Sequence, residues 1–210
     1  MSAIEQIHTH AVMDRRVRVL ADHLGALLPR EARVLDVGCG DGRLARALVA
    51  LRPDLSVRGV DVLVREDAAI EVEAFDGQTL PVPDDGVDAV LFVDVLHHTE
   101  HAEALLAEAK RAARTCVVLK DHLLRGPLAG ATLRFMDRVG NARHGVALPH
   151  LYWPKTQWRH TFSTLGLEVE AWETRLGLYP FPASLLFDRN LHFVARLGVS
   201  KPSAREGDAA

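Results

Sequence analysis

Three glycines alternate with other residues in the segment 34–43, which reads VLDVGCGDGR: Gly38, Gly40 and Gly42. Glycine is needed where the backbone turns with positive φ, or where a ligand comes too close for a Cβ. A helix that starts after them offers free N–H groups and a partial positive charge, which suits the carboxylate of a bound amino-acid group. Because Arg43 replaces the last glycine of the dinucleotide fingerprint, the segment favours a nucleoside with an amino-acid tail over a pyrophosphate.

Acidic residues follow at the ends of the next expected strands. Asp61 comes where doubly wound folds place an acid on ribose hydroxyls, and Asp76 ends the next strand, where it can accept a hydrogen bond from an adenine amino group. Asp94 ends a strand beside which the sheet order should reverse, the usual ligand crevice. The simpler alternatives are that the glycines only form a tight turn and that the strand-end acids are only solvated. The predicted cofactor-binding residues are Asp36, Gly38, Cys39, Gly40, Gly42, Asp61, Val62, Asp76, Gly77 and Asp94.

Histidines are the candidate proton acceptors. His97 and His98 follow Asp94, and His122 follows the next buried strand, so all three are expected to open on the same crevice. The unperturbed pKa of a histidine, about 6.5, suits a general base, although each of these side chains could instead simply pack. We name all three as catalytic candidates. No tight ligand spacing links the histidines, so no metal site is expected.

The segment from Lys110 to Arg143 suggests how a substrate that accepts a transferred group would be held. Its cations far outnumber its acids, which indicates either a solvated helix face or a clamp for a carboxylate or phosphate. The candidate substrate-binding residues are Arg134, Arg138, Arg143, His144 and Tyr152. The link 176–187 is unusually apolar, and if exposed it would mark a ligand groove or a subunit interface.

These residues need elements that bring them together. Apolar runs predict strands, and helical spacing of apolar residues predicts helices between them. The strands are expected at 33–37, 56–60, 72–75, 88–93, 115–120, 168–172 and 192–197, and the helices at 4–28, from 41 to before Pro53, and at 103–114, 128–139 and 154–165. This alternation predicts an α/β doubly wound sheet. Trp153, Trp158 and Phe162 are expected to be core contacts.

Composition places the chain among ordinary globular proteins. Its 210 residues are 48% hydrophobic and 25% charged, with a net charge of −3 that argues against a general nucleic-acid binder. No apolar run reaches the roughly 18 residues that span a bilayer, and the first residues do not resemble a signal peptide. Two cysteines, Cys39 and Cys116, are expected to be unpaired in a reducing cytoplasm. We predict one domain over 1–200, with an N-terminal helix over 1–30, an acceptor-side lid over 123–165 and a flexible tail over 201–210.

The run from Val34 to Lys120 resembles the class I S-adenosylmethionine-dependent methyltransferases, especially the small-molecule group often called type 11. The matching residues are Asp36, Gly38, Gly40 and Gly42 in the first motif, Asp61 as the ribose-binding acid, Asp76 with Gly77 on the adenine side, and 88–98, with its LHH, in the fourth motif. The resemblance implies S-adenosylmethionine as cofactor and S-adenosylhomocysteine as product. It also implies a Rossmann-like seven-stranded sheet whose last strand is antiparallel, with a helical lid inserted.

The acceptor is not specified by these motifs. We favour an enzyme that methylates a small organic or lipid-like acceptor, possibly anionic, and we expect no nucleic-acid partner. The alternatives are an RNA or protein methyltransferase, or a non-catalytic module that binds the cofactor and regulates a partner. The use of a general base, the pathway and the oligomeric state stay open, with a homodimer possible.

Overall fold

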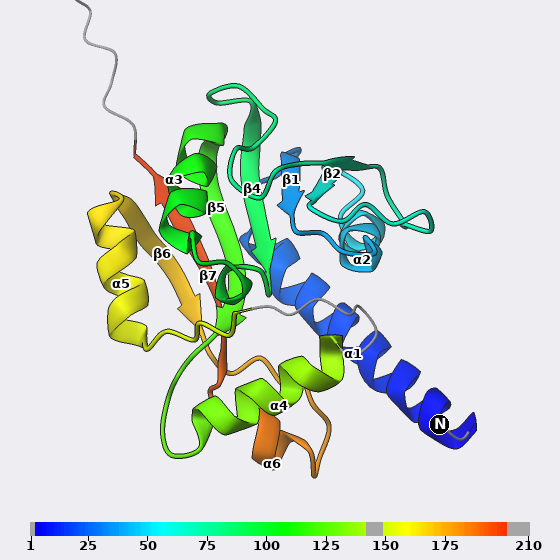
Figure 1. The fold of residues 1–210 in the computed structure, drawn as a ribbon. Helices are drawn as coiled ribbons and strands as arrows, with labels where there is room; N and C mark the ends of the chain where they lie inside the picture. The colour runs from blue at the N-terminus through cyan, green and yellow to red at the C-terminus, as the bar shows by residue number, and fades with distance from the viewer. Residues whose placement is uncertain (1–2, 142–148, 201–210) are drawn as a thin grey trace, which may run out of the picture.

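The computed structural model describes residues 3–141 and 149–200 of the chain. Arg143, His144 and the predicted tail 201–210 therefore lie outside the described residues. Seven strands form one mixed sheet, with helices on both of its faces (Figure 1). The strands are β1 (Arg33–Val37), β2 (Ser56–Asp61), β3 (Val72–Ala74), β4 (Val87–Val93), β5 (Ala113–His122), β6 (Leu167–Glu173) and β7 (His192–Val199).

The strand order is β3-β2-β1-β4-β5-β7-β6. Neighbours among β1 to β5 are parallel, and β7 runs antiparallel to both β5 and β6. This confirms the predicted Rossmann-like sheet with an antiparallel last strand. The order reverses between β1 and β4, so their carboxyl ends border the crevice in which doubly wound folds bind ligands.

The five predicted helices lie close to their expected ranges, whereas a short sixth helix and a 3-10 turn were not predicted. The helices are α1 (Ala3–Leu27), α2 (Arg43–Leu51), α3 (Ala102–Ala112), α4 (Ala129–Asn141), α5 (Lys155–Thr164) and the short α6 (Ser184–Phe187), with a 3-10 turn at Leu96–His98. The largest difference from prediction is in β5, which runs on to His122. Asp121 and His122, which the prediction left out, pair with β7 and are buried like the predicted Lys120, so polar side chains here hid the end of the strand. None of the described helices is long and apolar enough to cross a membrane.

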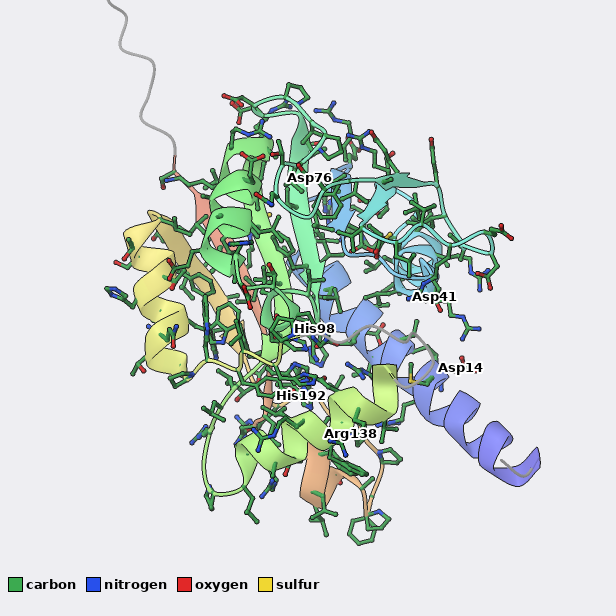
Figure 2. The ribbon with its side chains drawn as sticks, in the orientation of Figure 1. Asp14, Asp41, Asp76, His98, Arg138 and His192 are labelled. Carbon is green, nitrogen blue, oxygen red and sulfur yellow. The ribbon has the colours of Figure 1, made fainter. Side chains whose placement is uncertain are left out.

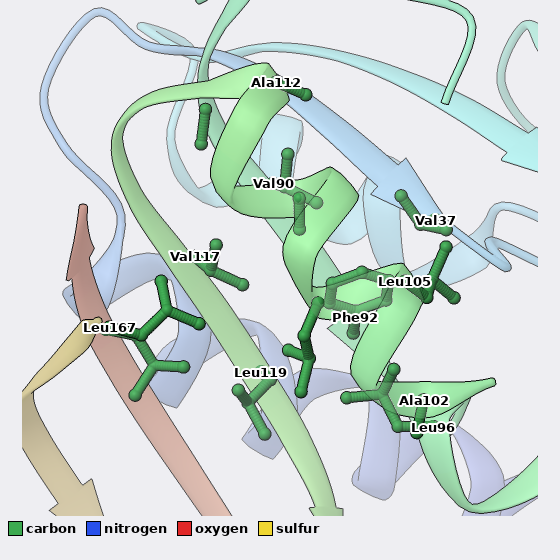
Figure 3. Packing of buried hydrophobic residues seen from close by; sticks show 14 of the residues in the cluster. Val37, Val90, Phe92, Leu96, Ala102, Leu105, Ala112, Val117, Leu119 and Leu167 are labelled. Atoms are coloured by element: carbon green, nitrogen blue, oxygen red, sulfur yellow. The ribbon is translucent and has the colours of Figure 1, made fainter. Parts of the chain in front are cut away.

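The sheet has an apolar core on each face because side chains alternate along its strands. Val90 and Phe92 of β4 pack towards α3, where Leu105 meets them (Figure 3). Ala89 and Leu91, which alternate with them along β4, belong to the apolar cluster on the other face of the sheet, which includes side chains of α1 and α2. Trp158 and Phe162 of α5 are buried in the α3-side core and Trp153 packs against it, which confirms the predicted core contacts.

The predicted lid 123–165 is divided between two places. α5 covers the sheet through Trp158 and Phe162, whereas α4 lies beyond the carboxyl ends of the strands, next to α6 (Figure 1). Ala129 and Leu133 of α4 form a small separate core with Leu191. Among the described residues of this range, the α4 part is therefore the one that borders the crevice.

Candidate functional site

A cavity of about 560 Å³ opens at the carboxyl ends of β1, β2 and β4. One end is formed by the β1–α2 loop and the residues after β2. The other end is formed by the residues after β4, by His122 at the end of β5 and by α4. Met13, Arg16, Val17 and Leu20 of α1 also line it. The N-terminal helix is thus part of the site, a role that its apolar spacing did not reveal.

The three glycines of the turn after β1 are of two kinds. Gly38 has φ +70°, and a Cβ there would lie 2.6 Å from Cγ2 of Val95, so this position must be glycine for the turn to pack. Gly42, which does not line the cavity, resembles Gly38: it has φ +71°, and a Cβ there would lie 2.7 Å from Cγ1 of Ile70. Gly40 has φ +59°, but the nearest atom to its Cβ would be Nη2 of Arg65, at 3.9 Å. Gly40 therefore leaves open space in the cavity, which is what close approach of a ligand to the backbone requires.

Two carboxylates lie beside this turn. Asp61 accepts hydrogen bonds from the N–H of Gly40 (2.8 Å) and the N–H of Leu63 (2.9 Å), which fix its orientation at the end of β2. Asp36 is 2% exposed, and its burial together with the nearby charge of Asp61 raises its pKa to about 7. Both carboxylates line the cavity, so a cationic or hydroxyl-bearing ligand would find acceptors here.

Some of the other predicted cofactor residues line the cavity and others do not. Cys39, Val62 and Gly77 line the cavity, and burial raises the pKa of the Cys39 thiol to about 12. Asp76 does not line it. Its Oδ1 accepts hydrogen bonds from the N–H groups of Gln78 and Thr79, and it lies far from His98 in Figure 2. The adjacent Phe75 lines the cavity instead and was not predicted.

Asp94 also lines the cavity, but its carboxylate is bound within the protein. Its two oxygens accept hydrogen bonds from the Lys120 ammonium and the Arg16 guanidinium. Burial opposes the charge of Asp94, but these cations prevail and hold its pKa below the usual range. Asp94 thus connects α1, β4 and β5, and its predicted contact with the cofactor stays a prediction.

The three candidate histidines meet at the α4 end of the cavity, where His98 and His122 line it and His97 lies behind them. His97 Nδ1 is 2.6 Å from Asp121 Oδ1, and its Nε2 is 3.4 Å from Asp137 Oδ2. Burial alone would lower the pKa of His97, but the two carboxylates outweigh it and raise the pKa to about 10. His97 is therefore a cation at neutral pH.

The two histidines that face the cavity are neutral. Burial and the charge of His97 lower the pKa of His98 to about 4. Burial and the charges of Lys120 and His97 hold the pKa of His122 well below its ordinary value. His122 is 2% exposed with its Nδ1 at 3.3 Å from His97 Nδ1, whereas His98 is half-buried. A molecule in the cavity can therefore reach His98 more easily.

Of the candidate acceptor residues, the three that the structure describes, Arg134, Arg138 and Tyr152, do not line the cavity. The Tyr152 hydroxyl donates a hydrogen bond to Oδ2 of Asp137. Asp137 lines the cavity, whereas Tyr152 does not. Arg134 and Arg138 are exposed on α4, and neither lines the cavity (Figure 2 labels Arg138). The helix presents Met136 and Asp137 to the cavity instead. The helical phase of α4 relative to the sheet decides this, and it could not be read from the surplus of arginines.

Two groups of described side chains have potential metal ligands within 4.8 Å of one another. They are Asp94, His97, Asp121 and His122 in one, and His97, His98 and Asp137 in the other. In the first group Asp94 is already neutralised by Arg16 and Lys120, and in both groups His97 is paired with a carboxylate. The side chains thus balance their own charges, and the expectation of no metal stays a prediction.

Comparison with known proteins gives a family for this arrangement. The sequence model of a family described as "Methyltransferase domain" matches residues 7–171. The matched part contains the glycine turn, both carboxylates beside it and the three histidines.

Two curated relatives and a solved structure add detail. The 27-O-demethylrifamycin SV methyltransferase of Amycolatopsis mediterranei (strain S699) is 29% identical over 153 residues, 65% of this chain and 56% of that protein. The probable tRNA methyltransferase 9B of Mus musculus is 25% identical over 126 residues, 53% of this chain and 27% of that protein. The chain thus spans about half the length of the first relative and less of the second.

The solved structure is a Haloferax volcanii putative methyltransferase in complex with the Trm112 methyltransferase activator. It superposes with a TM-score of 0.66 at 17% identity, covering 92% of this chain and 93% of that one. At this identity the likeness establishes a shared fold.

Proposed function

The chain belongs to the methyltransferase domain family, and from this premise we propose that it transfers the methyl group of S-adenosylmethionine to a small organic or lipid-like acceptor. The observation that carries the proposal is one continuous cavity with different chemistry at its two ends. The open glycine, Gly40, and two carboxylates stand at one end, and the neutral His98 stands at the other.

The cofactor fits the first end. Asp61 is held by two backbone N–H groups and keeps acceptor capacity for ribose hydroxyls. Gly40 leaves room for close approach to the backbone, and the buried Asp36 offers a carboxylate to a cationic ligand. Val62, Phe75 and Gly77 would border the adenine.

Methyl transfer asks mainly for alignment and exclusion of water. S-adenosylmethionine supplies a methyl group on a sulfonium, and the sulfur keeps the electron pair when that bond breaks. The acceptor oxygen or nitrogen forms the new bond to carbon and loses its proton. We assign the acceptance of that proton to His98, which is neutral at physiological pH and open to the cavity. His97 is a positioning residue, because it does not line the cavity and its ring packs against the ring of His98, with the two centroids 3.9 Å apart.

A small acceptor is supported by the wall opposite the glycine turn. Met13, Val17 and Leu20 of α1 and Met136 of α4 line it, which suits an apolar body. The Amycolatopsis relative, a methyltransferase named for a small-molecule substrate, agrees with this. An anionic clamp by Arg134 and Arg138 stays a prediction, and unchanged acceptor affinity in both alanine variants would contradict it.

An RNA acceptor is the second candidate, because the mouse relative is named as a probable tRNA methyltransferase. A non-catalytic module that binds the cofactor and regulates a partner is the third. The Haloferax neighbour is in complex with a protein activator, so a protein of this fold can bind a protein partner. Turnover with small acceptors, against salt-sensitive turnover with RNA, separates the first two. Cofactor binding with no turnover on any acceptor would favour the third.

Calorimetric titration of S-adenosylmethionine and S-adenosylhomocysteine tests the cofactor site. We expect micromolar binding that weakens about tenfold or more in Asp61→Ala, which corresponds to about 1.4 kcal/mol. Asp67→Ala, an exposed acid that does not line the cavity, is the control and should bind as the wild type does. If neither compound binds the wild-type chain, the proposal is wrong.

A further inference from the structure

Six large apolar side chains are exposed on the outer side of α4 and around α6, each between 57% and 79%. We call them the docking face, and they are Leu128, Phe135, Val139, Phe181, Leu185 and Leu186. Single exposed apolar residues are common, but a contiguous group of this size is typical of an interaction surface. The methyl-transfer chemistry uses none of these side chains.

The docking face is held together by contacts between its two helices. The rings of Phe135 and Phe187 stack with centroids 6.3 Å apart. Arg189 donates to the Thr132 hydroxyl of α4 (2.9 Å) and to the Leu186 carbonyl of α6 (3.0 Å). α4 and α6 lie next to each other in Figure 1, beyond the ends of the strands. The apolar side chains on α4 and α6 therefore belong to one preformed surface, and Leu128 and Phe181 stand one and three residues before these helices.

The exposed charges around the docking face, within the described residues 123–141 and 176–191, are all positive. Arg125, Arg134, Arg138 and Arg189 are exposed there. Within the described residues 123–141 and 176–191 the acids are Asp137, which faces the cavity and is 7% exposed, and the half-buried Asp188, which accepts the N–H of Tyr179. The chain as a whole carries −3, so the basic character is a local property of this surface.

We propose that the docking face binds the surface of an anionic lipid bilayer. Exposed Phe and Leu side chains insert at the boundary between headgroups and acyl chains, and arginines around them pair with anionic headgroups. A second copy of the same face would bring arginines against arginines with no exposed acid in these ranges to neutralise them. The phosphates of a nucleic acid would pair with the arginines but would leave the exposed apolar side chains without an apolar partner.

The docking face lies on the other side of α4 from the cavity. Met136 and Asp137 on the inner side of α4 line the cavity, while Phe135 and Val139 on its outer side belong to the docking face. One helix thus separates the cavity from the bilayer. The contact would therefore hold the cavity beside the bilayer in which a lipid-like acceptor is dissolved.

Co-sedimentation of the full chain with vesicles tests this proposal. The probes are vesicles of phosphatidylcholine alone and of phosphatidylcholine mixed with phosphatidylglycerol. We expect binding to the mixed vesicles that falls with added salt, and much weaker binding to the neutral ones. Arg134→Glu/Arg138→Glu should weaken binding about tenfold or more, since one arginine near an anionic surface contributes about fivefold. Leu185→Ser/Leu186→Ser should also weaken it about tenfold or more, because it removes two apolar side chains from the inserted part of the surface.

The matched control is Arg46→Glu/Arg159→Glu, which makes the same charge change on exposed residues of α2 and α5 and should bind as the wild type does. Equal loss in the control, or no preference for anionic vesicles, would overturn the proposal. So would light scattering that shows a dimer in the wild type and a monomer in Leu185→Ser/Leu186→Ser. The assay needs neither cofactor nor acceptor, so its failure leaves the proposed methyl transfer untouched.

Discussion

The carboxylate of Asp94, at the end of β4, accepts a hydrogen bond from the ammonium of Lys120, a side chain of β5 that is completely buried. Arg16 of α1 binds the other oxygen of the same carboxylate. The three residues come from three different elements, so one carboxylate links the N-terminal helix to the centre of the sheet. Two buried or partly buried cations depend on it for charge balance.

Asp94→Asn is therefore expected to destabilise the protein by about 3–5 kcal/mol, because removing one partner leaves uncompensated buried charge. Urea unfolding followed by circular dichroism measures this directly. Asp67→Asn, an exposed acid, is the control and should change the free energy of unfolding by about 0.5 kcal/mol or less. A loss below about 1 kcal/mol in Asp94→Asn would show that Lys120 and Arg16 find other partners.

The glycine turn gives a pair of variants that separate folding from binding. In Gly40→Ala the new methyl group enters open space, so we expect a stability loss of about 1–2 kcal/mol from the positive φ alone, with affinity for S-adenosylmethionine reduced about tenfold or more. In Gly38→Ala the Cβ also collides with Val95, so the stability loss should be about 1–3 kcal/mol larger. Thermal unfolding and calorimetry measure the two effects. Unchanged affinity in Gly40→Ala would remove this residue from the proposed cofactor site.

The pKa of Asp36 predicts a pH dependence of folding. The folded protein keeps the Asp36 proton up to about pH 7, whereas the unfolded chain loses it near pH 3.9, the ordinary value for an aspartate, so the folded state binds more protons between these values. The contribution of Asp36 to the free energy of unfolding therefore falls as pH rises through that window. Asp36→Asn removes this loss, and at pH 8 it should be more stable than the wild type by on the order of a few kcal/mol. Melting without ligand at pH 5 and pH 8 tests this, because the gain should be much smaller at pH 5.

The same carboxyl group should make cofactor affinity depend on pH. A proton on Asp36 competes with a cationic ligand, so S-adenosylmethionine is expected to bind more tightly as pH rises through about 7. The dependence should disappear in Asp36→Asn. Binding that is independent of pH in the wild type would mean that Asp36 does not face the charged part of the cofactor.

His98 carries the proposed proton transfer, and its removal should lower kcat by about 10² to 10⁴. Once an acceptor is known, His98→Asn should show this loss with the dissociation constant of S-adenosylmethionine unchanged. His160→Asn, on the exposed side of α5, is the matched control and should keep wild-type kcat. A His98→Asn variant with near wild-type kcat would show that alignment alone suffices, or that His122 takes the proton.

The order and type of the elements follow from local patterns in the sequence. Apolar runs such as that of β4 and helical spacing such as that of α3 act within a few residues, so their ranges were predicted to within about two residues at most ends. The glycine turn and Asp61 were also found this way, because a strand, a glycine and a strand-end acid are neighbours along the chain. The prediction for β5 stopped at Lys120 and missed Asp121 and His122, whose burial depends on partners in other elements.

The sequence alone therefore determined the sheet, the helices and the edge of the sheet at which the cavity opens, because each depends on periodicity and on turns. Only the tertiary structure decided which side chains face the cavity. His97 and His98 are adjacent in the chain, yet one lies behind the wall and the other lines it. Arg16 meets Asp94 across 78 residues of sequence, and α4 turns Asp137 inward and Arg138 outward. Such choices depend on how elements pack against one another, and no local pattern encodes the rotation of a helix about its own axis.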